Sequence, residues 1–224
     1  MATLPMNKSK PTALRATQTA LPRPPIALIA NGFATQLVIE AVLAAVKAGL
    51  RWVHLRDHEA APERFQCEAK ALAARVRSVH PATTLTVNTR LRTARTLGAG
   101  LHTGWRGPRP EAIAAPIPRP LGYSAHHVLE LPPARRRVVD YVTYSPIFPT
   151  SSKPGHPGTG VDALRRFGRQ AGVPVLALGG LTPERVAPCR RAGAAGIAVL
   201  SGIVHADNPT QAARAYQQAW KEAG

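Results

Sequence analysis

Residues 173–203 read VPVLALGGLTPERVAPCRRAGAAGIAVLSGI and carry the clearest structural pattern in the chain. The apolar run VLAL at 175–178 ends in a Gly-Gly pair, which is typical of a buried strand followed by a tight turn. Thr182 and Pro183 then suit the N-cap and first position of a helix. A second apolar run follows at 197–200. The stretch therefore predicts strand, helix and strand, and such wholly apolar strands are typical of a parallel sheet covered on both faces.

The turns after these two strands form a candidate phosphate site. Gly179 and Gly180 end the first strand, and Ser201 follows the second. In parallel barrels, the loops after the last two strands often hold a phosphate through backbone N–H groups. The glycines would also be needed simply to make tight turns, so both interpretations remain open.

Outward from this stretch, the same alternation of strand and helix recurs along the chain. Further strands are predicted at 26–30, 52–55, 85–87, 100–104, 121–126 and 141–144. Further helices are predicted at 37–48, 62–79, 91–97, 128–137, 161–170 and 209–220. Eight such units predict an α/β fold, a single-domain (β/α)8 TIM barrel with its active site at the carboxyl ends of the strands. A doubly wound open sheet is the alternative, although no GxGxxG motif follows the first strand.

The domain organisation expected from composition is simple. Residues 1–24 contain no acidic residue and several prolines, which predicts a disordered basic leader, with a transit peptide as the alternative. Residues 25–224 form the barrel. No apolar run approaches the roughly 20 residues that span a membrane. Cys67 and Cys189 lie far apart and outside any metal-type spacing, so we expect reduced thiols and a cytoplasmic location.

The charge of the chain is unusual, with a formal net value of +17 at pH 7. Such a charge attracts polyanions, so nucleic acid has to be considered as a partner. Only 5% of the residues are aromatic, which argues against a platform for stacking bases. We therefore expect a solvated Arg-rich exterior, or steering of a phosphorylated ligand, rather than nucleic-acid binding.

Polar side chains gather at the carboxyl ends of the predicted strands. Alternation along each strand directs one set of side chains toward the barrel mouth, including His54, Arg56, Asn88, Ser124 and His126. Unpaired buried polar groups are unfavourable, so a mouth lined in this way indicates a polar ligand. The histidines lack an HxH motif and accompanying carboxylates, so we expect no zinc site.

Arg56 is the strongest single candidate, because a guanidinium can hold a phosphate with two parallel hydrogen bonds. The alternative is a structural ion pair with Asp57 or Glu59. The loop at 145–160, SPIFPTSSKPGHPGTG, offers Thr150, Ser152 and Lys153 as further phosphate donors. Its glycines would let it close over a ligand as a lid, and a solvated basic loop is the alternative.

Seven motifs together resemble the thiamine phosphate synthase/TenI superfamily of small barrels. In chain order they are VHLRD, TVNTRL, GLHTG, LGYSAH, DYVTYSPIFPTSSK, VPVLALGGLTPERV and GAAGIAVLSGI. The resemblance implies a thiamine-pathway enzyme. In the synthases, a thiazole phosphate attacks an aminopyrimidine methyl centre as pyrophosphate leaves.

The resemblance also implies roles for individual residues. Pyrophosphate would be held by Arg56, Asn88, Ser124, Thr150, Ser152 and Lys153. Thiazole phosphate would meet Gly179, Gly180 and Ser201.

The sequence departs from the synthase pattern on the second strand, where His54 and His58 replace a Gln and a Lys, and at the positions implied for Mg²⁺. Thr89 and Gly107 stand where the family pattern has aspartates, and Mg²⁺ is normally held through carboxylates. Arg90 or Arg106 could substitute as counter-charge, and Asp57 or Asp140 could supply a carboxylate from elsewhere. The sequence thus favours a TenI-like barrel that binds thiazole phosphate and tautomerises it, without a cofactor.

The catalytic group of a TenI-like enzyme would be a general acid or base. Pro146 stands where the TenI pattern has its histidine, so the role falls to His126 or His54. A divergent, Mg²⁺-dependent thiamine phosphate synthase is the first alternative, and a non-catalytic, phosphate-binding regulatory barrel is the second. The expected partner is a small phosphorylated thiazole, with no membrane and no nucleic acid; a homo-oligomer is left open.

Overall fold

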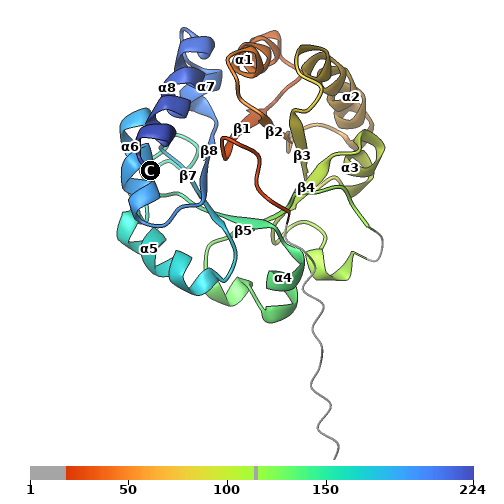
Figure 1. The fold of residues 1–224 in the computed structure, drawn as a ribbon. Helices are drawn as coiled ribbons and strands as arrows, with labels where there is room; N and C mark the ends of the chain where they lie inside the picture. Colours follow the sequence, from red (N-terminus) through yellow and green to blue (C-terminus); the bar gives the residue numbers. More distant parts are fainter. Residues whose placement is uncertain (1–18, 114–115) are drawn as a thin grey trace, which may run out of the picture.

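The computed structural model describes residues 19–113 and 116–224, in which eight parallel strands close into a barrel in sequence order (Figure 1). This confirms the predicted single-domain (β/α)8 barrel and excludes the open sheet. The strands are β1 (Ile26–Asn31), β2 (Trp52–Arg56), β3 (Thr84–Asn88), β4 (Gly100–Thr103), β5 (Leu121–Ala125), β6 (Tyr141–Tyr144), β7 (Val175–Leu178) and β8 (Gly196–Val199). Residues 1–18 of the predicted leader lie outside the described residues.

Helices surround the barrel in the order that the sequence pattern predicts (Figure 1). They are α1 (Gln36–Lys47), α2 (Pro62–Val79), α3 (Leu91–Leu97), α4 (Pro133–Val138), α5 (Gly160–Ala171), α6 (Pro183–Arg191), α7 (Ser201–Val204) and α8 (Pro209–Glu222), with short 3-10 turns at η1 (Pro110–Ala112) and η2 (Val128–Glu130). Among the described residues no helix is both long and apolar enough to cross a membrane.

Two local predictions need correction. The single helix expected at 128–137 is two pieces, η2 and α4, because a Pro-Pro pair at 132–133 cannot continue the first and instead starts the second. After β8, the expected turn at Ser201 is the first turn of the short helix α7.

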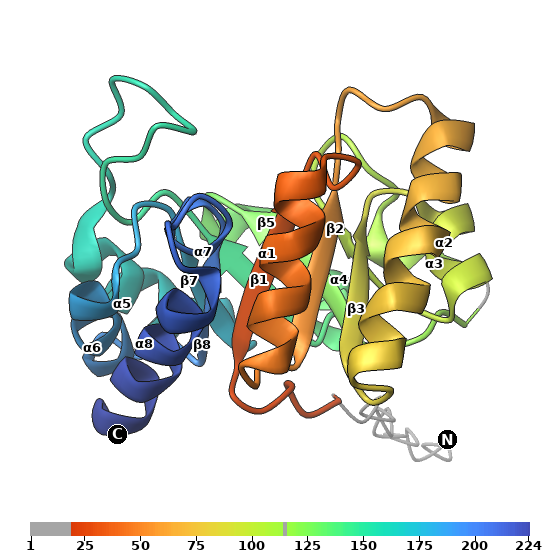
Figure 2. The ribbon, with the colours of Figure 1, turned by 90° about the horizontal axis from the view of Figure 1, so that it is seen from above.

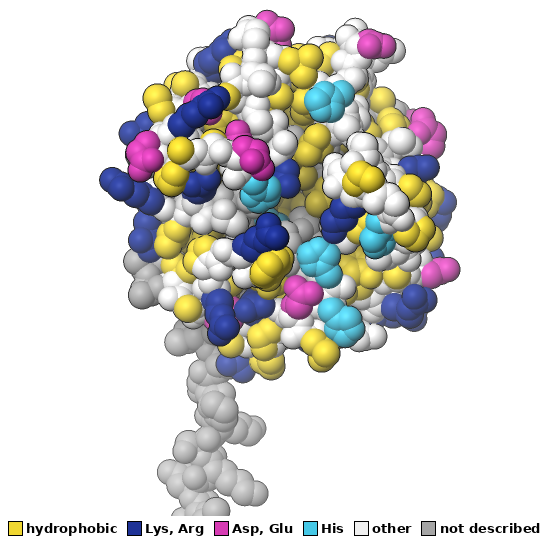
Figure 3. Space-filling model, turned by 180° about the vertical axis from the view of Figure 1, so that it is seen from behind, with side chains coloured by type: hydrophobic (Ala, Val, Ile, Leu, Met, Phe, Trp, Pro, Cys, Tyr) yellow, Lys and Arg dark blue, Asp and Glu magenta, His cyan; other side chains and the backbone are white. Residues whose placement is uncertain are grey.

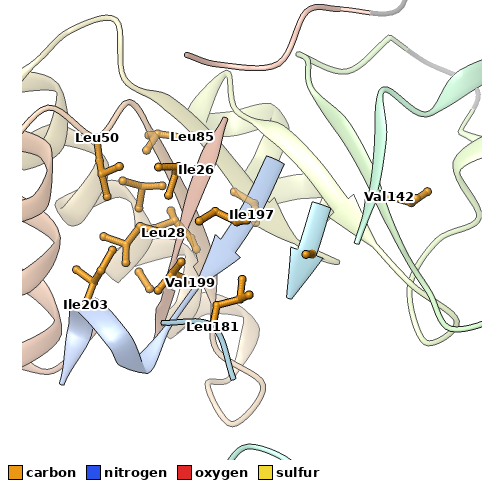
Figure 4. Packing of buried hydrophobic residues seen from close by; sticks show 14 of the residues in the cluster. Ile26, Leu28, Leu50, Leu85, Val142, Leu181, Ile197, Val199 and Ile203 are labelled. Carbon is orange, nitrogen blue, oxygen red and sulfur yellow. The ribbon is translucent and has the colours of Figure 1, made fainter. Parts of the chain in front are cut away.

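Strand alternation divides the apolar side chains into two layers. The larger layer lies between the strands and the helices; Figure 4 shows Leu28 of β1 and Val199 of β8 packed on the side that holds Leu50 and Ile203. The smaller layer fills the barrel interior with Ala27, Ile29, Trp52, Tyr141, Leu176 and Ala198. The interior is thus a packed core, and a ligand can enter only at an end of the barrel.

The two ends of the barrel differ. At the amino ends of the strands, the buried carboxylate of Asp140 accepts hydrogen bonds from the backbone N–H groups of Leu121 (2.6 Å) and Thr19 (2.8 Å) and pairs with Arg119 at 3.1 Å. At the carboxyl ends, the long loop between β6 and α5 stands above the barrel (Figure 2). Asp140 therefore secures the closed end, far from the mouth.

Candidate functional site

A pocket of about 450 Å³ opens at the carboxyl ends of the strands. Figure 3 views this end of the molecule and shows His, Lys and Arg side chains around a central hollow. The residues to which the sequence analysis gave catalytic or ligand-binding roles all line the pocket: His54, Arg56, Asn88, Ser124, His126, Thr150, Ser152, Lys153, Gly179, Gly180 and Ser201. The fold therefore brings the second strand, the long loop and the last two turns into one site.

Tyr141 and Thr143 of β6 also line the pocket, and they were not expected there. The signal that could have placed them is the alternation along β6, since both share a parity with Ser145, another lining residue.

The floor of the pocket is a hydrogen-bonded set of interior side chains. The indole Nε1–H of Trp52 donates to Oγ1 of Thr86 at 3.1 Å, and Nδ1 of His54 lies 2.9 Å from the same oxygen. The ring of His54 meets that of His102 edge to face, with centroids 5.1 Å apart. These polar groups are buried together and satisfy one another below the mouth.

His102 links this floor to the pocket wall. Its Nδ1 lies 2.9 Å from the Tyr141 hydroxyl and its Nε2 lies 2.8 Å from Oγ of Ser124, which also accepts a hydrogen bond from Thr143 at 3.3 Å. Both ring nitrogens are therefore engaged. The imidazole acts as a bridge that holds the Ser124 hydroxyl at the wall.

Burial keeps the two interior histidines uncharged. Desolvation lowers the pKa of His102 to about 4. The pKa of His54 also lies well below its ordinary value, mainly because of burial and secondarily because His102 and Arg56 are nearby. The charged form of His54 is thus disfavoured, and the ring is buried, whereas His126 lies exposed at the rim.

Gly122 makes room for the bridge between His102 and Tyr141. A Cβ at this position would lie 2.2 Å from Cζ of Tyr141 and 2.4 Å from Nδ1 of His102. We expect Gly122→Ala to lower the free energy of unfolding by about 1–3 kcal/mol, because both rings would have to move in a packed core. Urea unfolding measures this. Gly168→Ala is the matched control, because a Cβ there meets nothing within 4 Å and alanine suits the helix interior. Equal stability of the two variants would show that Gly122 is not needed to make room for the rings of His102 and Tyr141.

The Gly-Gly turn after β7 supports the base of the long loop. Gly179 and Gly180 have φ values of +98° and +62°, and a Cβ on either would lie 2.7 Å from Pro146 or 2.3 Å from the carbonyl oxygen of Pro149. The loop base pairs with this turn, since the N–H of Phe148 donates to the carbonyl of Gly179 at 3.1 Å. Close packing against the loop thus requires these glycines, whether or not they also contact a phosphate.

The base of the loop is also closed on itself. The N–H groups of Thr159 and Gly160 donate to the carbonyls of Pro146 (2.8 Å) and Ile147 (2.9 Å). The segment between these anchors carries Thr150, Ser152 and Lys153 over the pocket, as a lid requires.

The structure decides several questions about the charged residues near the mouth. Among the described residues, Arg56 makes no ion pair with Asp57 or Glu59; its guanidinium instead donates to Oδ1 of Asn31. Asp57 is used in a turn, where its Oδ1 accepts from the N–H groups of Glu59 (2.9 Å) and Ala60 (3.1 Å). Arg90 is directed away from the pocket, over the ring of Phe65, and donates to a carbonyl.

The residues of the mouth do not fit a Mg²⁺ ion. The pocket is lined by no aspartate or glutamate, and within the described residues no cluster of three or more His, Cys, Asp or Glu side chains could hold a metal. Asp57 is committed to its turn, and Asp140 lies at the opposite end of the barrel. The carboxylates that Mg²⁺ prefers are therefore lacking among the described residues of this site.

The sequence profile of the family described as thiamine monophosphate synthase matches residues 26–203, from β1 to α7. The chain belongs to this family. It is 35% identical over 190 residues to a thiamine-phosphate synthase of Chloroflexus aurantiacus, covering 83% of this chain and 85% of that one. It is 36% identical over 174 residues to a thiamine-phosphate synthase of Methanoregula boonei, covering 76% and 80%.

A longer relative contains the same region. The bifunctional thiamine biosynthesis protein ThiM/ThiE of Symbiobacterium thermophilum is 39% identical over 197 residues, which cover 84% of this chain and 39% of that protein. The chain therefore spans well under half the length of this bifunctional relative.

Solved structures of family members share the fold. The thiamine phosphate pyrophosphorylase of Pyrococcus furiosus superposes with a TM-score of 0.75 at 22% identity, covering 88% of this chain and 96% of that one. A thiamine phosphate pyrophosphorylase of Bacteroides thetaiotaomicron gives a TM-score of 0.63 at 20% identity, covering 88% and 95%. The family thus links the chain to thiamine biosynthesis, and the names of its relatives favour the synthase alternative over the TenI-like reading.

Proposed function

We propose that this barrel is a thiamine phosphate synthase, which joins a phosphorylated thiazole to an aminopyrimidine as pyrophosphate leaves. The observation that carries the proposal is the similarity to relatives named thiamine-phosphate synthase, at 35–36% identity over about four fifths of their length. The family model spans residues 26–203, a range that includes the strands and loops that build the mouth.

The pocket supports this chemistry through its charge. Pyrophosphate develops negative charge as its bond to the pyrimidine breaks, and preformed cations at that place stabilise the transition state. Arg56 and Lys153 reach the pocket from opposite sides of the mouth, at the end of β2 and on the long loop after β6. Asn88, Ser124, Thr150 and Ser152 add neutral donors. Gly179, Gly180 and Ser201 are assigned to the thiazole phosphate.

A tautomerase is the second candidate, and one specific observation favours it. Among the described residues no carboxylate lines the pocket, but the exposed His126 does, and imidazole is a common general acid or base. In that reading, the barrel would bind the phosphate of a thiazole carboxylate, and His126 would move the proton. His54 is less suited to this role, because it is buried and bonded to Thr86.

The experiment that tests the proposal combines binding with product formation. Thiazole phosphate and aminopyrimidine pyrophosphate are each titrated into the full chain, and thiamine phosphate is then assayed with both present. We expect both ligands to bind and product to form. We expect Arg56→Ala and Lys153→Ala to reduce kcat/KM about tenfold or more, because each removes a charge-assisted hydrogen bond. Lys70→Ala, on the exposed face of α2, is the control and should change little.

The two candidate reactions give different outcomes. Binding of thiazole phosphate alone, with no thiamine phosphate formed, would refute the synthase and support the tautomerase. In that case a His126→Gln variant should lose isomerisation of the thiazole carboxylate phosphate while still binding the ligand.

A further inference from the structure

We propose that the mouth of this barrel binds a polyphosphate anion directly through side-chain cations, with no divalent metal ion between them, and that Arg106 is one of the ligands. The inference deepens the proposed function, on which it rests for the identity of the anion, because it states how the departing pyrophosphate is held.

The first observation is the charge of the lining. Three cationic side chains, Arg56, Arg106 and Lys153, line the pocket together with His58, and among the described residues no aspartate or glutamate lines it. The ion pairs found among the described residues involve none of these four side chains. Repulsion between like charges is unfavourable, so a mouth of this kind is most stable with a bound anion.

The second observation is the position of Arg106 on a hydrogen-bonded turn after β4. The N–H of Gly107 donates to the carbonyl of Gly104 at 2.9 Å, and the hydroxyl of Thr103 donates to the carbonyl of Pro108 at 2.8 Å. The Arg106 guanidinium stacks on the Trp105 ring, with its carbon 4.7 Å from the ring centroid. Backbone and indole together hold the guanidinium at the rim.

Arg106 also lies near Arg56, the last residue of β2, and near His58, which follows that strand. His58 has a lowered pKa, first because of burial and then because of the charges of Arg56 and Arg106. These three side chains, from the end of β2, the loop after it and the turn after β4, therefore share one side of the mouth. A guanidinium has five N–H donors in a planar fork. The two guanidinium groups of Arg56 and Arg106 can therefore together hold several oxygens of one polyphosphate.

The third observation is that the turn has no room for a carboxylate at Gly107. A Cβ there would lie 2.3 Å from Oγ1 of Thr103 and 3.0 Å from Cγ2 of Thr89. The side chains that this turn can offer to a ligand are therefore those of Trp105 and Arg106. The turn thus carries the guanidinium of Arg106 where a Mg²⁺ site would need a carboxylate.

Isothermal titration of inorganic pyrophosphate into the full chain tests the inference, once in EDTA and once in excess Mg²⁺. We expect binding in EDTA, with no tightening when Mg²⁺ is added. Arg106→Ala should raise the Kd about tenfold or more, as expected for loss of a charge-assisted hydrogen bond. Arg109→Ala is the matched control, because it removes the same charge from an exposed position three residues away that does not line the pocket. It should change the Kd by about twofold or less.

Three results would overturn the inference: binding that requires Mg²⁺, no binding in either buffer, or equal effects of the two arginine variants. These outcomes are separable from a failure of the proposed function. If pyrophosphate binding depends on Mg²⁺ and thiamine phosphate is formed, the inference of metal-free binding is refuted and the synthase proposal stands. Arg106-dependent binding in EDTA without any product would remove only the synthase.

Discussion

Replacing Trp52 by alanine should lower the free energy of unfolding by about 3–5 kcal/mol, the range for truncating a large aromatic residue in a core. The Trp52 side chain is fully buried inside the barrel, where its ring meets Tyr141 edge to face with centroids 4.9 Å apart. Truncation would leave a cavity enclosed by strands, which cannot collapse inward without breaking the closed sheet. It would also remove the donor to Thr86 beneath the pocket.

Urea unfolding, followed by circular dichroism, measures the loss in Trp52→Ala. Trp105→Ala is the control, because that side chain is 74% exposed at the rim and its removal should change stability by about 0.5 kcal/mol or less. A larger loss in the free energy of unfolding for the first variant than for the second would show that the interior is packed and the mouth is open. Similar midpoints and slopes for both would mean that the interior of the barrel is not packed as described.

Acidification from about pH 7 to pH 4 should lower the free energy of unfolding by about 3 kcal/mol through His102 alone. Each pKa unit of difference between the folded and the unfolded chain corresponds to about 1.4 kcal/mol. The pKa of His102 falls from an ordinary value of 6.5 to about 4 in the folded chain, because burial disfavours the imidazolium. Between these values the unfolded chain binds a proton that the folded chain does not. The stability that neutral His102 contributes is therefore fully present above its pKa in the unfolded chain. It decreases as the pH falls and is lost below its pKa in the folded chain.

The measurement is a series of urea unfolding curves across this range for the native chain and for His102→Gln. Buried His54 should add a loss of the same sign, since its pKa is also lowered by burial. Because other groups titrate as well, the prediction concerns the difference between the two pH profiles. The variant should lose stability less steeply between about pH 6.5 and pH 4. Parallel profiles would show that His102 is not held neutral in the folded chain.

Much of the architecture could be predicted because it depends on local patterns. Short apolar runs ending in glycine, alternating with helical spacing, were sufficient for the eight units of the barrel. Errors arose where two local signals competed. The Pro-Pro pair divided the segment expected to be one helix at 128–137, and Ser201 started a helix where a turn was expected.

The composition of the site could be predicted for a similar reason. Alternation along the strands placed Arg56 and Ser124 at one mouth, because parallel strands all end on the same side of the barrel, and the composition of the loop after the sixth strand added Lys153. Alternation could not distinguish a side chain that reaches the ligand from one that is bonded beneath it. His54 and His126 were therefore equal candidates in the sequence, whereas in the fold one is buried against Thr86 and the other is exposed.

The sequence by itself thus determined the barrel, the family and the end at which the site lies, because these depend on periodicity and on motifs that are continuous in the chain. Only the tertiary structure decided how charge is arranged there. It directed Arg90 to Phe65 and Arg106 to the pocket, used Asp57 in a turn and placed Asp140 at the far end. The physical reason is that the charge balance of a site depends on contacts between residues distant in sequence, and on which hydrogen bonds each side chain already makes.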